Sequence, residues 1–230
     1  MKGMTTLANV AHRVSEQAKN HQDAVINAQD LSFENLGSVL IDGQHHPLMP
    51  NAQNLIANRL SIPPSYLRRC DDDLQAENLN AWLNRMDDKQ FFLRFDGSAV
   101  RAIFTPRYTP LDNHEVLDRL FDLGMTPDTM VQAHLDADFM SLSIPNPSQT
   151  FSIAKNDSIT PGLSIANSEV GKSCLRISAY TLRLLCTNGL IANSETCSAS
   201  FRHISRNIMA ELPSVLREVA LQPHNQTDQV

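Results

Sequence analysis

The chain lacks the features that mark several large classes of protein. No apolar run approaches the about 18–20 residues needed to cross a bilayer, and the N-terminus has no secretory signal. The four cysteines, at positions 70, 174, 186 and 197, form no C-x-x-C pair, which argues against zinc and favours reduced thiols. Basic residues are not in excess, because the net charge is −6 and the pI about 5.7. We therefore expect a cytoplasmic protein without membrane association, metal or broad attraction to nucleic acid.

What the chain does have is enough apolar sequence for a sizeable core. It contains 230 residues, 42% of them hydrophobic, which suits one domain or two small ones. Helical periodicity dominates before residue 88, and strand periodicity dominates after it. This order predicts an α+β fold with an N-terminal helical region followed by a mainly antiparallel sheet with packed helices. The expected divisions are 1–88, where short strands accompany the helices, 89–221, which should form one compact unit with 1–88, and a disordered tail at 222–230.

Individual elements follow from periodicity, caps and turn residues. Helices are predicted at residues 5–19, 50–60, 64–69, 74–86, 112–123 and 204–221. Strands are predicted at residues 24–27, 38–42, 91–95, 99–104, 130–134, 139–144, 163–166, 174–185 and 197–203. Asp96-Gly97 favours a tight turn, so residues 91–104 should form a hairpin.

This hairpin is a candidate for binding single-stranded nucleic acid. One face would carry Phe91, Leu93, Phe95, Val100, Ala102 and Phe104, and the opposite face Phe92, Arg94, Arg101 and Ile103. Bases stack on exposed rings while guanidinium groups hold phosphates. If the later strands pair, the surface would extend to Arg107, Lys172, Arg176, Arg183 and Arg202. The alternative is a sheet whose second face is covered by a helix, with the arginines at its rim.

Residues 56–69, IANRLSIPPSYLRR, resemble a repressor-type helix-turn-helix. Ser61 would occupy the turn, and Ile62 and Leu67 would pack the corner. Tyr66 and Arg68 would then face base edges. Two consecutive prolines leave little room for base-reading side chains, and helical corners of this spacing also occur as packing units. Both interpretations stay open.

Residues 166–173, ANSEVGKS, match the loose form of a phosphate-binding loop. Such a loop is followed by a buried helix, whereas Leu175, Ile177 and Ala179 alternate with polar residues as in a half-buried strand. Glu169 would also repel phosphate. A nucleotide-dependent enzyme is therefore a minor candidate, and we predict no catalytic residue and no cofactor.

Three sequence blocks together resemble a known family. They are LSIPPSYL with ENLNAWL at 60–67 and 77–83, RAIFTPRYTPLDNHEV at 101–116, and NSEVG at 167–171 leading to CTNGL at 186–190. Over residues 47–203 the chain is similar to the phage/plasmid-like protein family, which is catalogued as a domain of unknown function. The resemblance implies carriage on mobile genetic elements, and it brings no established reaction and no agreed site residues.

Together these observations predict a non-enzymatic DNA-transaction accessory protein of a phage or plasmid. Single-stranded DNA binding or annealing by a homo-oligomer is the leading mechanism. The predicted nucleic-acid-binding residues are Phe92, Arg94, Arg101, Arg107, Arg176 and Arg183. The alternative is an interaction module that binds a host protein, for example to block a defence system.

Overall fold

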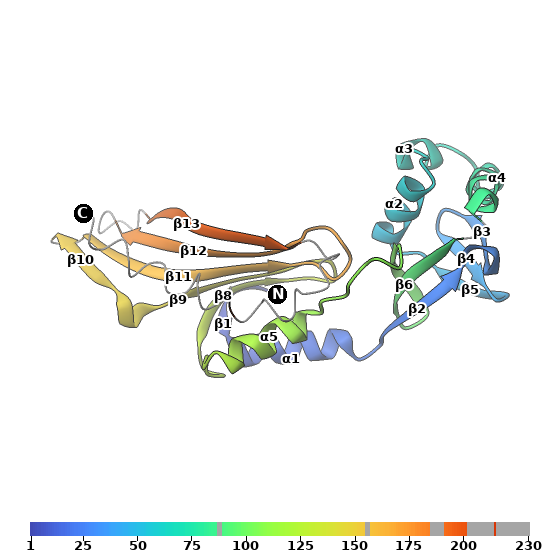
Figure 1. The fold of residues 1–230 in the computed structure, drawn as a ribbon. Coiled ribbons are helices and arrows are strands. Elements are labelled where there is room, and N and C mark those ends of the chain that lie inside the picture. The colour runs from blue at the N-terminus through green and yellow to red at the C-terminus, as the bar shows by residue number, and fades with distance from the viewer. Residues whose placement is uncertain (87–88, 155–156, 185–190, 202–213, 215–230) are drawn as a thin grey trace. The chain divides into compact units, whose positions relative to one another are not determined.

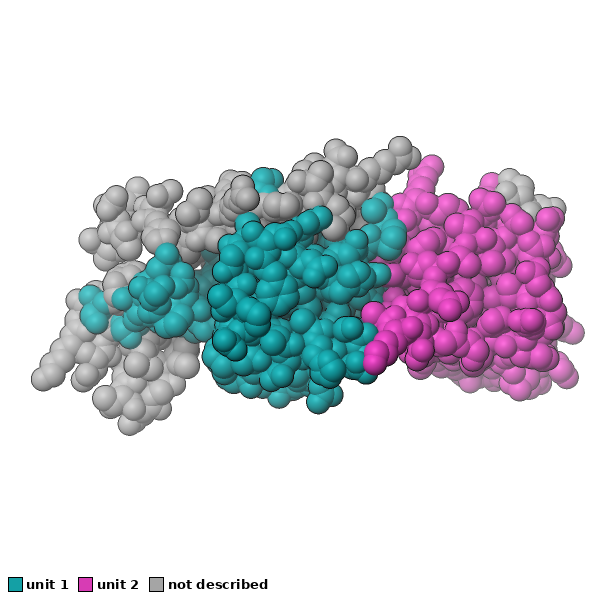
Figure 2. All heavy atoms as spheres, turned by 90° about the horizontal axis from the view of Figure 1, so that it is seen from below, with its two compact units in different colours: residues 1–16, 109–230 teal, residues 17–108 magenta. Residues whose placement is uncertain are grey.

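The computed structural model describes residues 1–86, 89–154, 157–184, 191–201 and 214 (Figure 1). The chain divides into two compact units, coloured separately in Figure 2. Unit 1 comprises Met1–Glu16 and Thr109–Val230, and unit 2 is Gln17–Tyr108. Unit 2 is thus an insertion within the sequence of unit 1, and the chain crosses between the units twice. The divisions between the units fall at 16/17 and 108/109. The sequence predicted a boundary at 88/89 between two segments that were expected to form one compact unit. The predicted helix at 204–221 and the predicted tail lie outside the described residues, apart from Ser214.

Unit 1 is built on a 7-stranded antiparallel sheet in the order β1-β8-β9-β11-β12-β13, with β10 paired to β11. The strands are β1 (Lys2–Thr6), β8 (Met130–Leu135), β9 (Met140–Pro145), β10 (Phe151–Ala154), β11 (Asp157–Asn167), β12 (Leu175–Leu184) and β13 (Ile191–Phe201). Strand β1 pairs with β8, from Lys2 opposite His134 to Thr6 opposite Met130. The predicted N-terminal helical region is therefore wrong, because the chain begins in this sheet.

Two helices cover one face of this sheet, α1 (Leu7–Ala18) and α5 (Asn113–Asp122), and a 3-10 turn, η3, spans Pro147–Gln149 (Figure 1). The helices contribute Leu7, Val10, Val14, Val116, Leu117 and Leu120 to a core shared with the inward residues of β8, β9, β11 and β12. Asp112 caps α5, and its backbone N–H donates to Glu115 Oε2 at 2.8 Å in a capping box. Both helices confirm the predicted amphipathic patterns.

Unit 2 contains two 3-stranded sheets and a group of helices. One sheet joins β2 (His21–Asn27), β6 (Gln90–Asp96) and β7 (Ala99–Phe104), and the other joins β3 (Leu31–Asn35), β4 (Ser38–Ile41) and β5 (Gln44–Pro47). The helices are α2 (Pro50–Arg59), α3 (Pro64–Leu67) and α4 (Asp72–Leu83), with 3-10 turns η1 (Ala28–Asp30) and η2 (Asn84–Met86). The Asn80 side chain links α4 to β3. Its Oδ1 accepts a hydrogen bond from Phe33 N–H at 2.8 Å, and its Nδ2 donates one to Phe33 O at 2.8 Å.

The β6–β7 hairpin forms as predicted but contains one extra residue. Asp96 pairs with Ala99, Phe95 with Val100 and Arg94 with Ala102, so Arg101 is the additional residue of a β-bulge. Since successive side chains point to opposite faces, one extra residue reverses the faces of the rest of β7. Ala102 and Phe104 therefore share the face of Arg94 and Phe92, and the predicted assignment of Ala102, Ile103 and Phe104 is wrong.

Within the described ranges, no helix has both the length and the apolar character needed to span a membrane. The same part of the chain holds no group of three His, Cys, Asp or Glu side chains able to bind a metal ion. Cys70 and Cys174 carry free thiols, as predicted. Cys186 and the side chain of Cys197 lie outside the described part.

Candidate nucleic-acid interface

Arg94 and Arg101, two of the predicted phosphate-binding residues, lie inside unit 2. Arg94 is only 1% exposed and Arg101 only 3%. Arg94 Nε donates to Asp23 Oδ1 at 2.9 Å, and Nη2 donates to Asp23 Oδ2 at 3.1 Å. Asp23 lies directly opposite Arg94 on β2, so the guanidinium is committed to a bidentate ion pair. The prediction that these two arginines lie on an exposed surface is therefore wrong.

Phe92 belongs to a group of three stacked rings on the same face of the sheet. Tyr108 lies parallel to Phe104, with ring centroids 3.9 Å apart and an interplanar angle of 2°. Phe92 lies 5.7 Å from Tyr108 at an angle of 29°. All three side chains are half-buried. We call Phe92, Phe104 and Tyr108 the aromatic cluster.

The sequence alone identified one member of this cluster. Phe104 was assigned to the wrong face because the bulge at Arg101 has no clear sequence signal. Tyr108 follows β7 and returns over the sheet through a turn in which its N–H donates to the C=O of Thr105 at 3.0 Å. A cluster of this kind depends on turn geometry as well as on alternation, so periodicity could not reveal it.

Arg107 precedes Tyr108 and is exposed. It lines a cavity of about 740 Å³ that is formed by residues of unit 2. The cationic residues that line this cavity are Arg59, Lys89 and Arg107, and the amides that line it are Asn27, Gln29 and Gln90. None of the described residues that line it is acidic. We call it the basic cavity. The sequence singled out Arg107 and did not indicate that Arg59 and Lys89 line the same cavity, because the segments that meet here are far apart in the chain.

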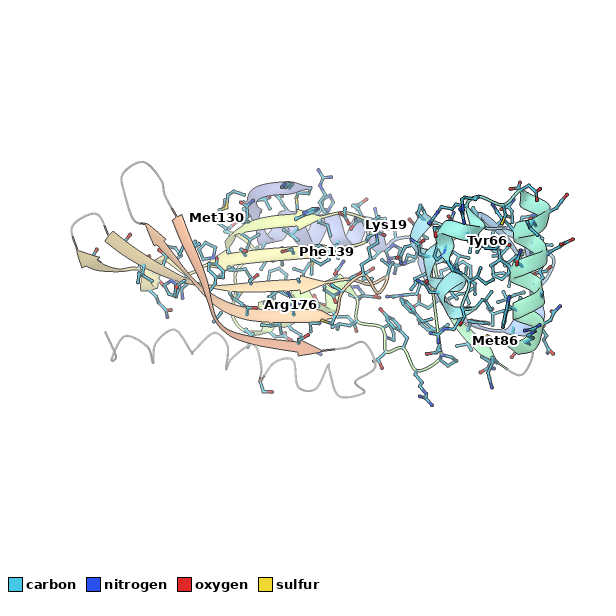
Figure 3. All side chains as sticks on the ribbon, turned by 90° about the horizontal axis from the view of Figure 1, so that it is seen from above. Lys19, Tyr66, Met86, Met130, Phe139 and Arg176 are labelled. Carbon is cyan, nitrogen blue, oxygen red and sulfur yellow. The ribbon has the colours of Figure 1, made fainter. Side chains whose placement is uncertain are left out.

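The remaining predicted residues belong to unit 1. Arg176, labelled in Figure 3, is exposed on β12 opposite Ala166 and Ser200. The backbone of Arg183 pairs with Ile159 and Ala192, and its side chain is outside the described part. Arg202 is outside it as well. The six predicted residues are thus divided between the two units.

Asn167 and Glu169, within the string at 166–173, belong to a buried polar cluster at the start of α5. Asn167 Nδ2 donates to Leu111 O at 3.1 Å and to Asn113 Oδ1 at 2.9 Å. Asn113 N–H donates to Glu169 Oε1 at 2.7 Å, which places a carboxylate at the positive end of the helix dipole. These contacts tie α5 to the end of β11.

Lys172 and the strand that follows it do not resemble a phosphate loop. Lys172 Nζ donates to Asp138 Oδ2 at 2.5 Å, and its backbone N–H donates to Ser168 Oγ at 3.0 Å. After Ser173 the chain enters strand β12, as predicted, where a phosphate loop would continue into a helix.

The corner at residues 56–69 is compact and mostly apolar inside. Ile62 is 5% exposed and Leu67 is fully buried. Helix α3 has four residues, about one turn, and Arg68 Nη2 donates to Asn54 Oδ1 at 2.5 Å. One turn of helix offers little length for reading base edges, so this geometry favours the packing interpretation.

Comparison with known proteins gives one match. The family model described as a domain of unknown function (DUF932) matches residues 101–225, which is slightly more than half of the chain. The matched range begins at the bulge residue of β7 and continues through α5 and the later strands of unit 1. No curated protein and no solved structure matches.

Proposed function

The chain belongs to the DUF932 family of unknown function, and we propose that it is a non-enzymatic accessory protein that binds single-stranded DNA for a phage or plasmid. The observation that supports this proposal most strongly is the aromatic cluster, which lies beside the exposed Arg107. The resemblance of the three sequence blocks to phage/plasmid-like proteins supports the mobile-element context.

Stacked aromatic side chains are suited to single strands rather than duplexes, because only unpaired bases expose their faces. Stacking of one base on a ring contributes about 1–3 kcal/mol and tolerates any base. The Phe104 and Tyr108 rings cover each other's inner faces, so a base would stack on the outer, partly exposed faces of the cluster. Arg107, the neighbour of Tyr108, supplies a cation for the phosphate backbone.

The salt dependence of binding tests the proposed roles of Phe92 and Arg107. The measurement is fluorescence anisotropy of a labelled oligothymidine with the full chain over a range of salt concentrations. Phe92→Ala should cost about 1–3 kcal/mol through lost stacking and leave the salt slope unchanged. Arg107→Ala should lower the slope by about 0.7, the value for one contact with single-strand phosphate. Failure of the wild-type chain to bind at low salt would exclude the proposal.

A specific surface favours a second candidate, binding to a host protein. On α4 Leu74 is 40% exposed and Trp82 is 42% exposed, and the guanidinium carbon of Arg85 lies 4.3 Å from the Trp82 ring centroid. Tryptophan and arginine are enriched at the energetic centres of protein interfaces. Co-purification of one defined host protein that is lost in Trp82→Ala and retained in Tyr108→Ala would support this candidate. Equal recovery with both variants would exclude it.

A further inference from the structure

We propose that the basic cavity of unit 2 binds the phosphate monoester of a nucleotide, with Arg59 and Arg107 holding the phosphate group. The ligand is either a free mononucleotide or the terminal phosphate of a nucleic-acid strand, since both present the same chemistry. The inference rests on the proposed function in taking nucleic acid as the source of the ligand. The cavity is distinct from the aromatic cluster, and Arg107 is the one residue that both proposals use.

The described residues that line the cavity include three cations and no carboxylate. Arg59 comes from the last turn of α2, Lys89 from the segment before β6 and Arg107 from the segment after β7. Arg59 and Arg107 are exposed, and neither side chain forms a hydrogen bond or ion pair with any described residue. Arg94, by contrast, is neutralised by Asp23, and Arg119 Nη1 bonds Asp122 Oδ2 at 2.8 Å. Two guanidinium groups therefore remain available for the phosphate oxygens, which they can bind in bidentate fashion.

The size and the lining of the cavity suit a nucleotide. Its volume of about 740 Å³ lies within the range of small-molecule sites and exceeds what a phosphate group alone would fill. Apolar surface comes from the buried Phe91 and from Pro106 and Met86, the last of which is labelled in Figure 3. Apolar surface beside side-chain amides suits a planar base, which has an apolar face and a polar edge.

Two of the three amides that line the cavity, Asn27 and Gln90, are held in place before any ligand binds. Gln90 Nε2 donates to Asn27 Oδ1 at 3.0 Å, and Asn27 Nδ2 donates to Asp30 Oδ2 at 2.8 Å. These bonds link the end of β2 to the start of β6 across the sheet. A wall fixed in this way reduces the entropy lost on binding and favours a ligand of defined shape.

The number of cations favours a monoester over an internal phosphodiester. Near pH 7 a phosphate monoester carries a charge of about −1.5 to −2 and offers three acceptor oxygens. A diester within a strand carries a single negative charge. The two guanidinium groups of Arg59 and Arg107 match the more highly charged group, so a strand end or a free nucleotide should bind better than the middle of a strand.

The first experiment is calorimetric titration of the full chain with thymidine monophosphate, thymidine and inorganic phosphate. Thymidine monophosphate should bind more tightly than either of the others. Arg59→Ala and Arg107→Ala should each weaken its binding about tenfold, whereas Arg69→Ala should not change it. Arg69 is a matched control because it is an exposed arginine of unit 2 that does not line the cavity. Equal binding of nucleotide and nucleoside, or equal effects of Arg59→Ala and Arg69→Ala, would overturn the proposal.

The second experiment separates the two ligand sources. Oligothymidine with a 5′-phosphate is compared with the same strand ending in a 5′-hydroxyl, using wild type and Arg59→Ala. A preference for the phosphorylated strand that disappears in Arg59→Ala assigns the cavity to a strand end. Binding of thymidine monophosphate without such a preference assigns it to a free nucleotide. Both outcomes support a monoester site.

Failure of this inference is distinguishable from failure of the proposed function. If oligothymidine binds through Phe92 and neither its 5′-phosphate nor thymidine monophosphate contributes, the cavity proposal is wrong and single-strand binding stands. If thymidine monophosphate binds through Arg59 and no oligonucleotide binds, the cavity proposal stands and single-strand binding is wrong. The melting temperature of each variant, measured by the fluorescence of Trp82 in unit 2, confirms that unit 2 remains folded.

Discussion

At the scale of single residues, unit 2 uses its arginines in two different ways. Arg94 is buried and paired with Asp23, where it joins neighbouring strands of a sheet. Arg59 and Arg107 are exposed and line the same cavity. The sequence could not separate these roles, because an arginine in an alternating strand looks the same whether a carboxylate faces it or solvent does. The difference arises from the pairing of β2 with β6, across more than sixty intervening positions.

The Arg94–Asp23 pair gives a prediction about stability. Asp23→Ala should destabilise unit 2 by about 1–3 kcal/mol, because it leaves a buried guanidinium without its carboxylate. We expect a smaller loss of unfolding free energy than for a completely buried pair, since the Asp23 side chain is 30% exposed. Urea unfolding followed by Trp82 fluorescence measures the change. Asp96→Ala, at a half-buried position of the same sheet, provides a comparison, and equal losses in both variants would contradict the importance of the pair.

Tyr180 gives a prediction about pH. Burial raises the pKa of Tyr180 from 10.0 to about 12, so the folded chain keeps this proton where the unfolded chain loses it. Its contribution to stability is therefore complete below pH 10 and is lost as the pH rises from about 10 to about 12. The loss from this one group is at most about 1.36 kcal/mol per pH unit. In Tyr180→Phe, urea unfolding followed by circular dichroism should show a shallower decline across that window. An identical decline in both proteins would refute this account.

At the scale of secondary-structure elements, the sequence predicted helices and strands that depend on local residues, and it missed those that depend on contacts with distant parts of the chain. The amphipathic helices α1 and α5 and the β6–β7 hairpin were predicted because their caps, turns and apolar periods are local. Strand β1 was missed, since its five residues are held in place by β8, far along the chain. The same limit applies to the site. Phe92 and Arg107 were predicted from the pattern. Tyr108 reaches Phe92 only through a turn, and Arg59 reaches the cavity of Arg107 only through long-range packing.

The start of α4 provides a test at this scale. Asp71 is its N-cap, and Asp71 Oδ1 accepts a hydrogen bond from Leu74 N at 2.9 Å. Asp71→Ala should destabilise unit 2 by about 0.5–2 kcal/mol, because an N–H of the first turn loses its acceptor. Asp73→Ala removes a similar exposed charge two residues later and leaves the cap intact. Equal urea midpoints for the two variants, read from Trp82 fluorescence, would contradict the assigned cap.

At the scale of the whole molecule, two separate apolar cores divide the chain. One core joins α1, α5 and the 7-stranded sheet, and the other joins the sheets and helices of unit 2. The sequence contains one tryptophan, Trp82, and it belongs to unit 2. Tryptophan fluorescence therefore reports on unit 2, whereas circular dichroism reports on both units.

This division predicts separable unfolding. Leu142 is fully buried in the core of unit 1. Leu142→Ala should lower the unfolding midpoint measured by circular dichroism and leave the midpoint measured by Trp82 fluorescence unchanged. Leu79→Ala, equally buried in unit 2, should shift the Trp82 transition. Each change should cost about 2–5 kcal/mol in its own unit. A single shared transition that moves by the same amount in both variants would show that the two cores unfold together.

The central claim, that the aromatic cluster of unit 2 binds single-stranded DNA, is tested most directly by one comparison. The affinity of the full chain for a labelled oligothymidine is measured at low salt for wild type, Tyr108→Ala and Tyr66→Ala. Both tyrosines belong to unit 2, and Tyr66, which is 37% exposed on α3, lies outside the cluster. We expect Tyr108→Ala to weaken binding by about 1–3 kcal/mol and Tyr66→Ala to leave it unchanged. Equal affinities for all three proteins, or no binding by the wild type, would contradict the claim.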